Sequence, residues 1–440
     1  MLSLPLALAL LVDPRAGRFD VSGGVVAELR GGYAPVAPNQ PASASFLTLI
    51  TPNIDLRYNH RRRGLLTFGY APRMLYRVPN LLRLARPLFL HQFQLRHVVS
   101  LDRRWTMGTS AIASVGELDY TALGIAFTGP QAAAPRADVI EFAIGDVSMS
   151  FTGRLDSRRS IAIVPSAGFR YPFGQDTTPD PDNPVTAFPQ QYAGNLGLAY
   201  SERVAPRDNV YVQSYQGVVD FRPGAMFVNS DSRVGWTRQV LRRLESRLDV
   251  GVFNAQVLAQ QDAAARLRGR VLPVGSYRLG GRLRSRAAYT IDGAFAAGVS
   301  GFFDVLGGNV QPRATGSAQL TVAMPPRWTF GLVSSLYTAA TAQPLPRSTG
   351  GVPQTESAFL NQLPITYRID DTKRIEFGLI TNVRTPHLAS SSFAGTQLEA
   401  WLYVAFRIAG GTARGGREVT NRGVGTGQGA NVGSGGVPVR

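Results

Sequence analysis

The chain has 440 residues, of which 44% are hydrophobic, and its formal net charge is +17. Beyond the N-terminus no uncharged apolar stretch approaches the roughly 18 residues of a membrane helix, so helical membrane spans are not expected. Cysteine is absent, which excludes a disulfide framework, a cysteine-ligated metal and a cysteine nucleophile.

The positive charge comes almost entirely from arginine, because Lys373 is the only lysine. Nucleic-acid-binding surfaces concentrate basic residues in a patch or a helix. In this chain the arginines recur instead in short connections from one end of the sequence to the other. We therefore expect no nucleic-acid partner.

Residues 2–12 are nearly all apolar. The stretch is long enough for the hydrophobic region of a secretory signal and too short to span a bilayer. It predicts export, although no basic residue precedes it and no clean A-x-A cleavage site follows. We expect residues 1–19 to be signal-like or disordered.

Alternation of apolar and polar residues with a period of two is the main structural signal, and it predicts β-strands. It is clearest near the C-terminus, where six apolar residues at even positions from Leu398 to Ile408 are interleaved with Glu399, Trp401, Tyr403 and Arg407. Residues 46–58 and 375–384 repeat the pattern. Helical spacing would have mixed the two sets on each face.

Short polar turns, each with a basic residue just before the next apolar stretch, join the candidate strands in pairs. They lie at residues 60–63, 101–104, 156–159, 205–208, 241–243, 284–286, 325–327 and 371–374. The connections at the opposite strand ends are longer, at residues 32–41, 78–86, 117–137, 172–190 and 338–355. Short turns on one side and long loops on the other are typical of transmembrane β-barrels of the outer membrane.

Eight hairpins, one strand over residues 20–31 and one over residues 396–408 give about eighteen strands, with about sixteen as the second choice. We therefore predict an all-β fold, a transmembrane antiparallel up-and-down barrel over residues 20–408. Residues 409–440 are rich in glycine and are expected to form a disordered tail. A glycine pattern in this tail has no strand before it and no helix after it, so it does not indicate nucleotide binding.

Aromatic residues near the strand ends match the girdles that membrane barrels place at the two interfaces. Those expected at the turn side are Trp105, Trp328, Phe330 and Phe377, and those expected towards the loop side are Tyr70, Tyr76, Phe169, Tyr171 and Tyr200.

Two strand starts share the motif Arg-Trp-Thr, at residues 104–106 and 327–329, and residues 51–58 read TPNIDLRY before a hairpin. With these motifs the chain resembles, over residues 20–408, the porin-like barrels of the Gram-negative outer membrane, some of which accompany polysaccharide export systems. The resemblance implies a location in the outer membrane and contact with its lipid and lipopolysaccharide. It also implies insertion by the barrel-assembly machinery, whose signal the strand ending near Phe406 resembles. In that class the signal usually closes the chain, whereas here a tail follows.

The sequence shows no group of residues in the spacing of a known catalytic site. The sequence has no H-E-x-x-H, G-x-S-x-G or P-loop motif, and its histidines are His60, His91, His97 and His387. The even spacing of His91 and His97 puts them on one strand face with Phe93 and Leu95, as packing or interface residues. We expect no catalytic residue, no cofactor and no metal site.

The alternation also predicts which charged residues face the barrel lumen. The candidates are Arg57, Arg73, Arg96, Arg170, Arg278, Arg282, Arg313, Arg368, Arg384, Arg407, Asp55, Asp292, Glu376 and Glu399. Such residues can brace the wall as ion pairs, or a surplus of arginine can lower the barrier for anions in an open pore.

Three functions follow from these alternatives. The first is a passive porin-like channel that favours small anionic solutes or acidic glycans. The second is a plugged structural or adhesive barrel, or the outlet component of a polysaccharide export system. The third, an outer-membrane enzyme, would need a compact catalytic cluster that the spacing does not supply.

Overall fold

A computed structural model describes most of the chain. The described residues are 17–35, 42–60, 64–78, 87–119, 139–173, 190–222, 225–260, 270–286, 288–304, 309–340, 355–385 and 397–411. The structure does not describe residues 1–16 and 412–440, the centre of the 60–63 turn or most of the long connections. His387 also lies outside the described ranges. In the described part of the chain no helix is long and apolar enough to cross a membrane.

The described residues form nineteen strand segments in one antiparallel sheet. They are β1 Gly17–Pro35, β2 Ala42–His60, β3 Gly64–Tyr70, β4 Arg73–Val78, β5 Leu88–Ser100, β6 Trp105–Asp119, β7 Val139–Arg154, β8 Arg159–Phe173, β9 Gln190–Ala205, β10 Asp208–Arg222, β11 Ala225–Leu241, β12 Leu244–Gln260, β13 Arg270–Ser285, β14 Thr290–Asp304, β15 Asn309–Met324, β16 Trp328–Ala340, β17 Thr355–Arg368, β18 Lys373–Thr385 and β19 Gln397–Gly411.

Two of these segments, β3 and β4, make up one strand. Both pair with β2 on one side and with β5 on the other. The interruption falls at Ala71 and Pro72, where proline has no N–H to donate to the ladder. The Ala71 N–H still donates to the carbonyl of Gln92 at 2.9 Å, which keeps the two segments in line. The sheet therefore has eighteen strands, as the turns predict.

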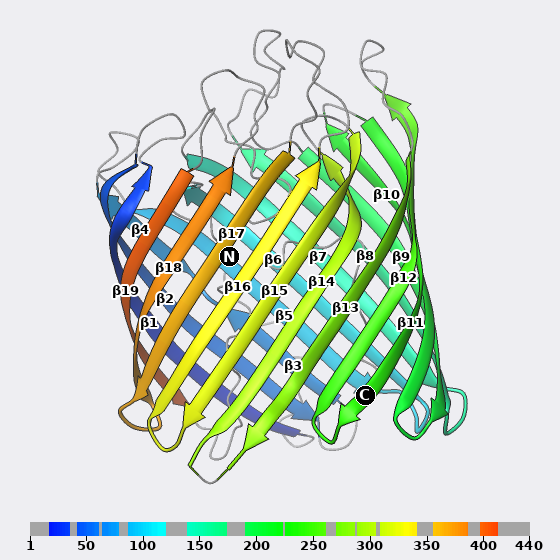
Figure 1. Cartoon of the computed structure of the whole chain (residues 1–440), viewed down its shortest axis with the longest axis horizontal. Helices are drawn as coiled ribbons and strands as arrows, with labels where there is room; N and C mark the ends of the chain where they lie inside the picture. Colours follow the sequence, from blue (N-terminus) through cyan, green and yellow to red (C-terminus); the bar gives the residue numbers. More distant parts are fainter. Residues whose placement is uncertain are drawn as a thin grey trace.

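The sheet closes on itself because β1 pairs with both β2 and β19. Ser22 lies opposite Gly411 and Tyr33 opposite Ala400 in the closing ladder. Figure 1 shows the blue N-terminal strands beside the orange C-terminal ones, and all strands tilted. The barrel thus spans residues 17–411, slightly more than the expected 20–408, and the expected tail from residue 409 begins inside β19.

Alternation fixes two faces on each strand. In β19, Leu398, Leu402 and Val404 are exposed, whereas Trp401 and Tyr403 are buried. Large apolar side chains are exposed in the same alternating way on the other strands, which gives an apolar outward belt around the closed sheet. An apolar belt on a closed antiparallel barrel is the architecture that crosses the bacterial outer membrane.

Three of the tight turns are built on aspartate. Leu101 to Arg104, Leu155 to Arg158 and Ile369 to Thr372 share the order apolar residue, then aspartate. In the second, the Asp156 Oδ1 accepts from the backbone N–H groups of Arg158 and Arg159 at 2.7 and 2.8 Å. This is the local side-chain bond that makes aspartate a turn residue. In the first two turns, arginines that mark the turn in the sequence supply backbone donors to the aspartate, and in the third turn Thr372 and Lys373 supply them.

The turn and loop sides differ from expectation at two points. The connection between β10 and β11 spans only residues 223–224, so one loop-side connection is short. Tyr200, expected towards the loop side, lies near the 206–207 turn at the opposite end of β9. Trp105 and Trp328 begin β6 and β16 directly after turns, as the girdle predicts.

Replacing Leu402 by arginine should destabilise the barrel, because Leu402 points outward from the middle of β19 with 68% of its surface exposed. Arginine at the bilayer midplane costs about 2–4 kcal/mol on the lipid face. The control is Gln94→Arg on the inward face of β5, which should be tolerated. Urea unfolding of the two variants in lipid vesicles checks this, and equal midpoints would contradict the assigned faces.

The aspartate turns should make stability depend on pH. The pKa of Asp156 is lowered by the two backbone N–H groups that it accepts, and that of Asp370 by the hydroxyl and N–H of Thr372 and the N–H of Lys373. Their contribution is therefore present above about pH 4, the ordinary pKa of aspartate, and is lost as the pH falls through the lower folded value.

The variant Asp156→Ala/Asp370→Ala should unfold at lower urea than the parent at pH 7, with the difference shrinking as the solution is acidified below about pH 4. Asp371→Ala is the matched control, because the Asp371 side chain is 93% exposed beside Arg368. A difference that stays constant down to pH 2 would show that these carboxylates do not hold the turns.

Candidate functional site

The inward wall of the barrel is the candidate site. The strand register places on the inward face every charged residue that alternation assigns to it, with the side chain of Arg384 outside the described residues. These residues do not form one cluster. They divide into buried or paired groups, a small set of exposed arginines, and Asp55, which is exposed and accepts from the Asn53 amide at 3.1 Å.

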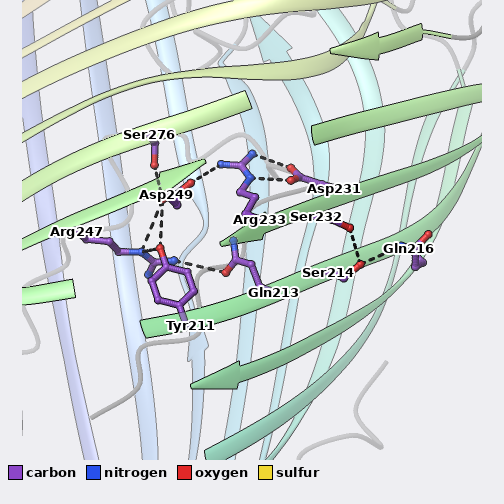
Figure 2. Close-up of polar contacts among 10 residues, drawn as sticks. All are labelled: Tyr211, Gln213, Ser214, Gln216, Asp231, Ser232, Arg233, Arg247, Asp249 and Ser276. Atoms are coloured by element: carbon purple, nitrogen blue, oxygen red, sulfur yellow. Dashed lines mark hydrogen bonds and ion pairs between the residues drawn. The ribbon is translucent and has the colours of Figure 1, made fainter. Parts of the chain in front are cut away.

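A buried ion-pair network lies on the inward face of β11 and β12 (Figure 2). Arg233 donates through Nε and Nη2 to both oxygens of Asp231 at 2.7 Å, and through Nη1 to Asp249 Oδ1 at 3.0 Å. The three side chains are between 3% and 6% exposed. The two-pronged contact uses the planar guanidinium fully, and such contacts are the strongest of their kind.

A second arginine extends this network towards the turn side. Arg247 donates to the Tyr211 hydroxyl at 2.6 Å, and its guanidinium lies 4.4 Å from the centre of the Tyr211 ring. Ser276 donates to Asp249 Oδ2 at 2.8 Å. The Tyr211 ring lies against the backbone of Gly235, where a Cβ atom would collide with it. Glycine at this point of β11 therefore leaves room for the aromatic ring.

The network balances its own charge, because two arginines face two aspartates. It therefore braces the wall and adds little to the field inside the barrel. Sequence reasoning did not single out Arg233 and Asp231. Their strand also carries Ser230 and Ser232 on the outward face, so the contrast between the faces is weak in this part of the sequence.

Other predicted arginines are also paired. Arg282 donates to Asp292 at 3.0 Å, and Arg407 lies 3.1 Å from Glu376. Arg368 lies 3.7 Å from Asp371 in the adjacent turn. The guanidinium of Arg313 lies 5.7 Å from the centre of the Tyr337 ring.

Three inward arginines are different. Arg57, Arg96 and Arg278 are exposed on the inward wall, and within the described residues they form no ion pair. Arg57 and Arg96 flank Thr67 in one row of the sheet, because Thr67 pairs with both. Strands are about 4.8 Å apart, so the two arginines lie about 10 Å apart along the wall.

Arg278 faces this pair from the other side of the barrel. It belongs to β13, and β13 is nine positions from the β3/β4 strand in the ring of eighteen: β5, β6, β7, β8, β9, β10, β11, β12, β13. All three arginines lie in the half of their strands nearer the short turns. Arginines without an ion pair among the described residues therefore lie on opposite walls of the barrel, in the half nearer the short turns.

Two apolar clusters also face inward on opposite walls. One holds Leu47, Leu75, Leu360, Ile380, Trp401, Tyr403 and Ala405, and the other holds Val219, Phe221, Phe227, Phe253, Ala255 and Val274. The first cluster is centred near β19 and the second on β11 and β12, so the two lie on roughly opposite sides of the ring. The arcs between them carry many small hydroxyl residues, including Ser110, Ser148, Thr315 and Ser317.

His91 and His97 are the histidines whose side chains the structure describes, and both are on the outward face. His91 lies opposite to the lumen on β5, and its Nδ1 is 2.8 Å from the Tyr70 hydroxyl. His97 shares this face. In the described ranges no group of three or more His, Asp or Glu residues could hold a metal ion.

Removing the charge of Arg233 should destabilise the barrel strongly. Arg233→Gln leaves Asp231 and Asp249 buried without their common partner, which typically costs about 3–5 kcal/mol. The control is Arg278→Gln, which removes an exposed inward arginine and should cost less than about 1 kcal/mol. Urea midpoints of the folded variants compare the two, and similar losses would mean that the network does not brace the wall.

Comparisons with known proteins bear on the fold alone. No family model matches the chain, and no curated protein matches its sequence. Among solved structures, it is similar to OccAB3 from Acinetobacter baumannii, with a TM-score of 0.44 and 9% identity over 89% of this chain and 99% of that one. It is also similar to the outer membrane protein OpdK from Pseudomonas aeruginosa, with a TM-score of 0.41 and 8% identity over 89% and 99%.

CdiB from Acinetobacter baumannii is a further neighbour, with a TM-score of 0.39 and 8% identity, and the chain covers 60% of its length. With scores of this size, the assignment of architecture rests on the strand pairing, the closure and the outward belt. In architecture, the chain is a closed β-barrel of eighteen strands, of the kind that crosses the bacterial outer membrane.

Proposed function

We propose that the barrel is a passive channel whose lumen favours anionic solutes, including acidic glycans. Barrels of 16 to 18 strands are wide enough to hold an aqueous channel. The proposed mechanism is electrostatic filtering, with no bond made or broken.

The observation that carries the proposal is the position of Arg57, Arg96 and Arg278. These arginines are exposed on the inward wall, stand on opposite sides of it and lack ion pairs with described residues. A charge without an ion-pair partner adds a net field to the lumen, and water and salt weaken this field without cancelling it. Water between low-dielectric walls focuses this field along the lumen, so the barrier falls for anions and rises for cations.

The paired arginines contribute far less to this selectivity. Arg233 and Arg282 each lie within 3.0 Å of a carboxylate oxygen. At the distance of a solute in the lumen, such an ion pair acts as a dipole. The field of a dipole falls off faster with distance than the field of a single charge. The excess of arginine in the sequence therefore overstates the charge that a solute would meet.

A plugged structural barrel is the second candidate, and the two inward apolar clusters favour it. Val219 and Ala255 are 0% exposed and Phe227 is 1% exposed, although their strands face the lumen. Buried apolar side chains on opposite walls narrow the part of the barrel nearer the long connections. If they met across the lumen, the barrel would not conduct.

The experiment is conductance in planar bilayers across a salt gradient. The parent protein should show discrete conductance with anion preference. That preference should weaken as salt rises, because the Debye length falls from about 30 Å at 0.01 M to about 10 Å at 0.1 M. The variant Arg57→Gln/Arg96→Gln/Arg278→Gln should shift the reversal potential towards neutrality or cation preference.

The matched control is Arg103→Gln/Arg158→Gln/Arg242→Gln, which removes the same charge from exposed turn residues. It should leave the reversal potential almost unchanged. If the folded variant Arg57→Gln/Arg96→Gln/Arg278→Gln kept the reversal potential of the parent, the proposed anion selectivity would be contradicted. If the parent protein showed no conductance, the plugged barrel would be favoured.

A further inference from the structure

Within the described residues, the largest polar interruption of the outward belt lies on three neighbouring strands, β10, β11 and β12. Its six members are Ser214 and Gln216 on β10, Ser230 and Ser232 on β11, and Asn254 and Gln256 on β12. On β1 and β19, by contrast, every outward position from Phe19 to Tyr33 and from Leu398 to Ile408 is apolar or glycine. The six residues are hereafter called the polar patch.

The register shows that the polar patch is continuous. Gln216 pairs with Ser230, and Ser230 pairs with Asn254, so three strands place polar side chains in one row. Ser214 and Ser232 are opposite each other in the next row. Their hydroxyl oxygens are 2.9 Å apart, and the Gln216 amide donates to Ser214 at 3.0 Å (Figure 2).

The polar patch lies at mid-depth in the bilayer. On β10, the outward charged residues Asp208 and Asp220 are at the two ends, and Ser214 is midway between them. With a rise of about 3.3 Å per residue and a tilt of about 40°, the segment between these aspartates spans about 30 Å along the membrane normal. This exceeds the apolar band of about 25 Å, so the polar patch is in its middle.

Polar amides at this depth are unfavourable against acyl chains, because lipid offers no hydrogen-bond partner. Within the described residues, the side chains of Ser230, Asn254 and Gln256 form no hydrogen bond, and Gln256 is exposed. A smaller polar group, Ser334, Asn361 and Thr381, satisfies itself by bonds of 2.7 and 3.5 Å. The unsatisfied amides of the polar patch need partners from outside the chain.

We propose that the polar patch is the interface between two copies of this barrel, related by a two-fold axis along the membrane normal. Such an axis brings each residue opposite the same depth on the partner. Amides and hydroxyls both donate and accept, so the polar patch is complementary to itself.

Charges at the rims fit the same arrangement. Asp220 and Arg222 lie at the loop-side edge with an ion pair of 2.7 Å, and Asp208 and Arg238 lie at the turn-side edge 3.9 Å apart. Each edge therefore carries one charge of each sign at similar depth. A second copy rotated by 180° presents each arginine to an aspartate, whereas a partner with a uniformly charged rim would meet one like charge at each edge.

The test uses the absence of cysteine from the chain. Single variants Ser214→Cys, Ser230→Cys and Ser232→Cys are oxidised in native outer membranes. They are compared with Val404→Cys on the outward face of β19, which is nine strands from β10 and eight from β11. At least one of the three should give several-fold more disulfide-linked dimer than Val404→Cys. Heat-modifiable mobility on gels confirms that each variant is folded.

A second variant separates a specific contact from random collision. Adding Gln216→Leu, Asn254→Leu and Gln256→Leu to the best cross-linking variant should reduce the dimer to the level of Val404→Cys while the barrel stays folded, because leucine is favourable in lipid. Persistence of the cross-link in this variant would overturn the proposal. Two other results would also overturn it. One is a monomeric mass of the parent protein in mild detergent together with no disulfide-linked dimer from any of the three cysteine variants. The other is a cross-link from these cysteines to a different protein.

Discussion

The structure depends on the closure of one hydrogen-bonded ladder. In a bilayer every backbone N–H and C=O must find a partner within the protein, so an open sheet edge cannot face lipid. The pairing of β1 with β19 removes both edges. Once the ring is closed, each strand has one face towards lipid and one towards the lumen, and the alternation along a strand acquires a physical meaning. The interruption at Pro72 is tolerated because β3 and β4 keep the same neighbours, which leaves the ring closed.

Closure also gives identical residue types different roles. Arg233 and Arg57 are both inward arginines, yet Arg233 is buried between two aspartates and Arg57 is exposed without an ion pair among the described residues. The neighbouring strands set the surroundings of each arginine: Asp249 of β12 accepts from Arg233, whereas Arg57 has Thr67 of β3 on one side and Asp20 of β1 on the other, and it forms an ion pair with neither. Charge density in the lumen therefore follows from which strands are adjacent. For the proposed channel, this leaves a small set of arginines to act on a solute.

The outward face follows the opposite principle. Lipid requires apolar side chains at mid-depth, and most strands provide them, but β10, β11 and β12 place amides and hydroxyls there. The same three strands carry the buried Arg233 network on their inward face. Polar residues on both faces weaken the alternation of apolar and polar residues in this segment of wall. At the proposed interface, a second barrel replaces lipid and supplies the hydrogen-bond partners that these outward polar side chains need.

Sequence alone determined the fold class, the strand count near eighteen and most turn positions, because a period of two and short polar turns are local properties. It also placed residues such as Arg96 and Glu376 on the inward side, since successive residues of a strand point to alternate faces.

The sequence could not decide which inward charges are paired. Arg233 and Asp249 are separated by a turn, Arg57 and Arg278 by half the ring, and their separation in space exists only after closure. The polar patch was likewise invisible, because six unremarkable polar residues on three strands become one surface only when the register aligns them at the same depth.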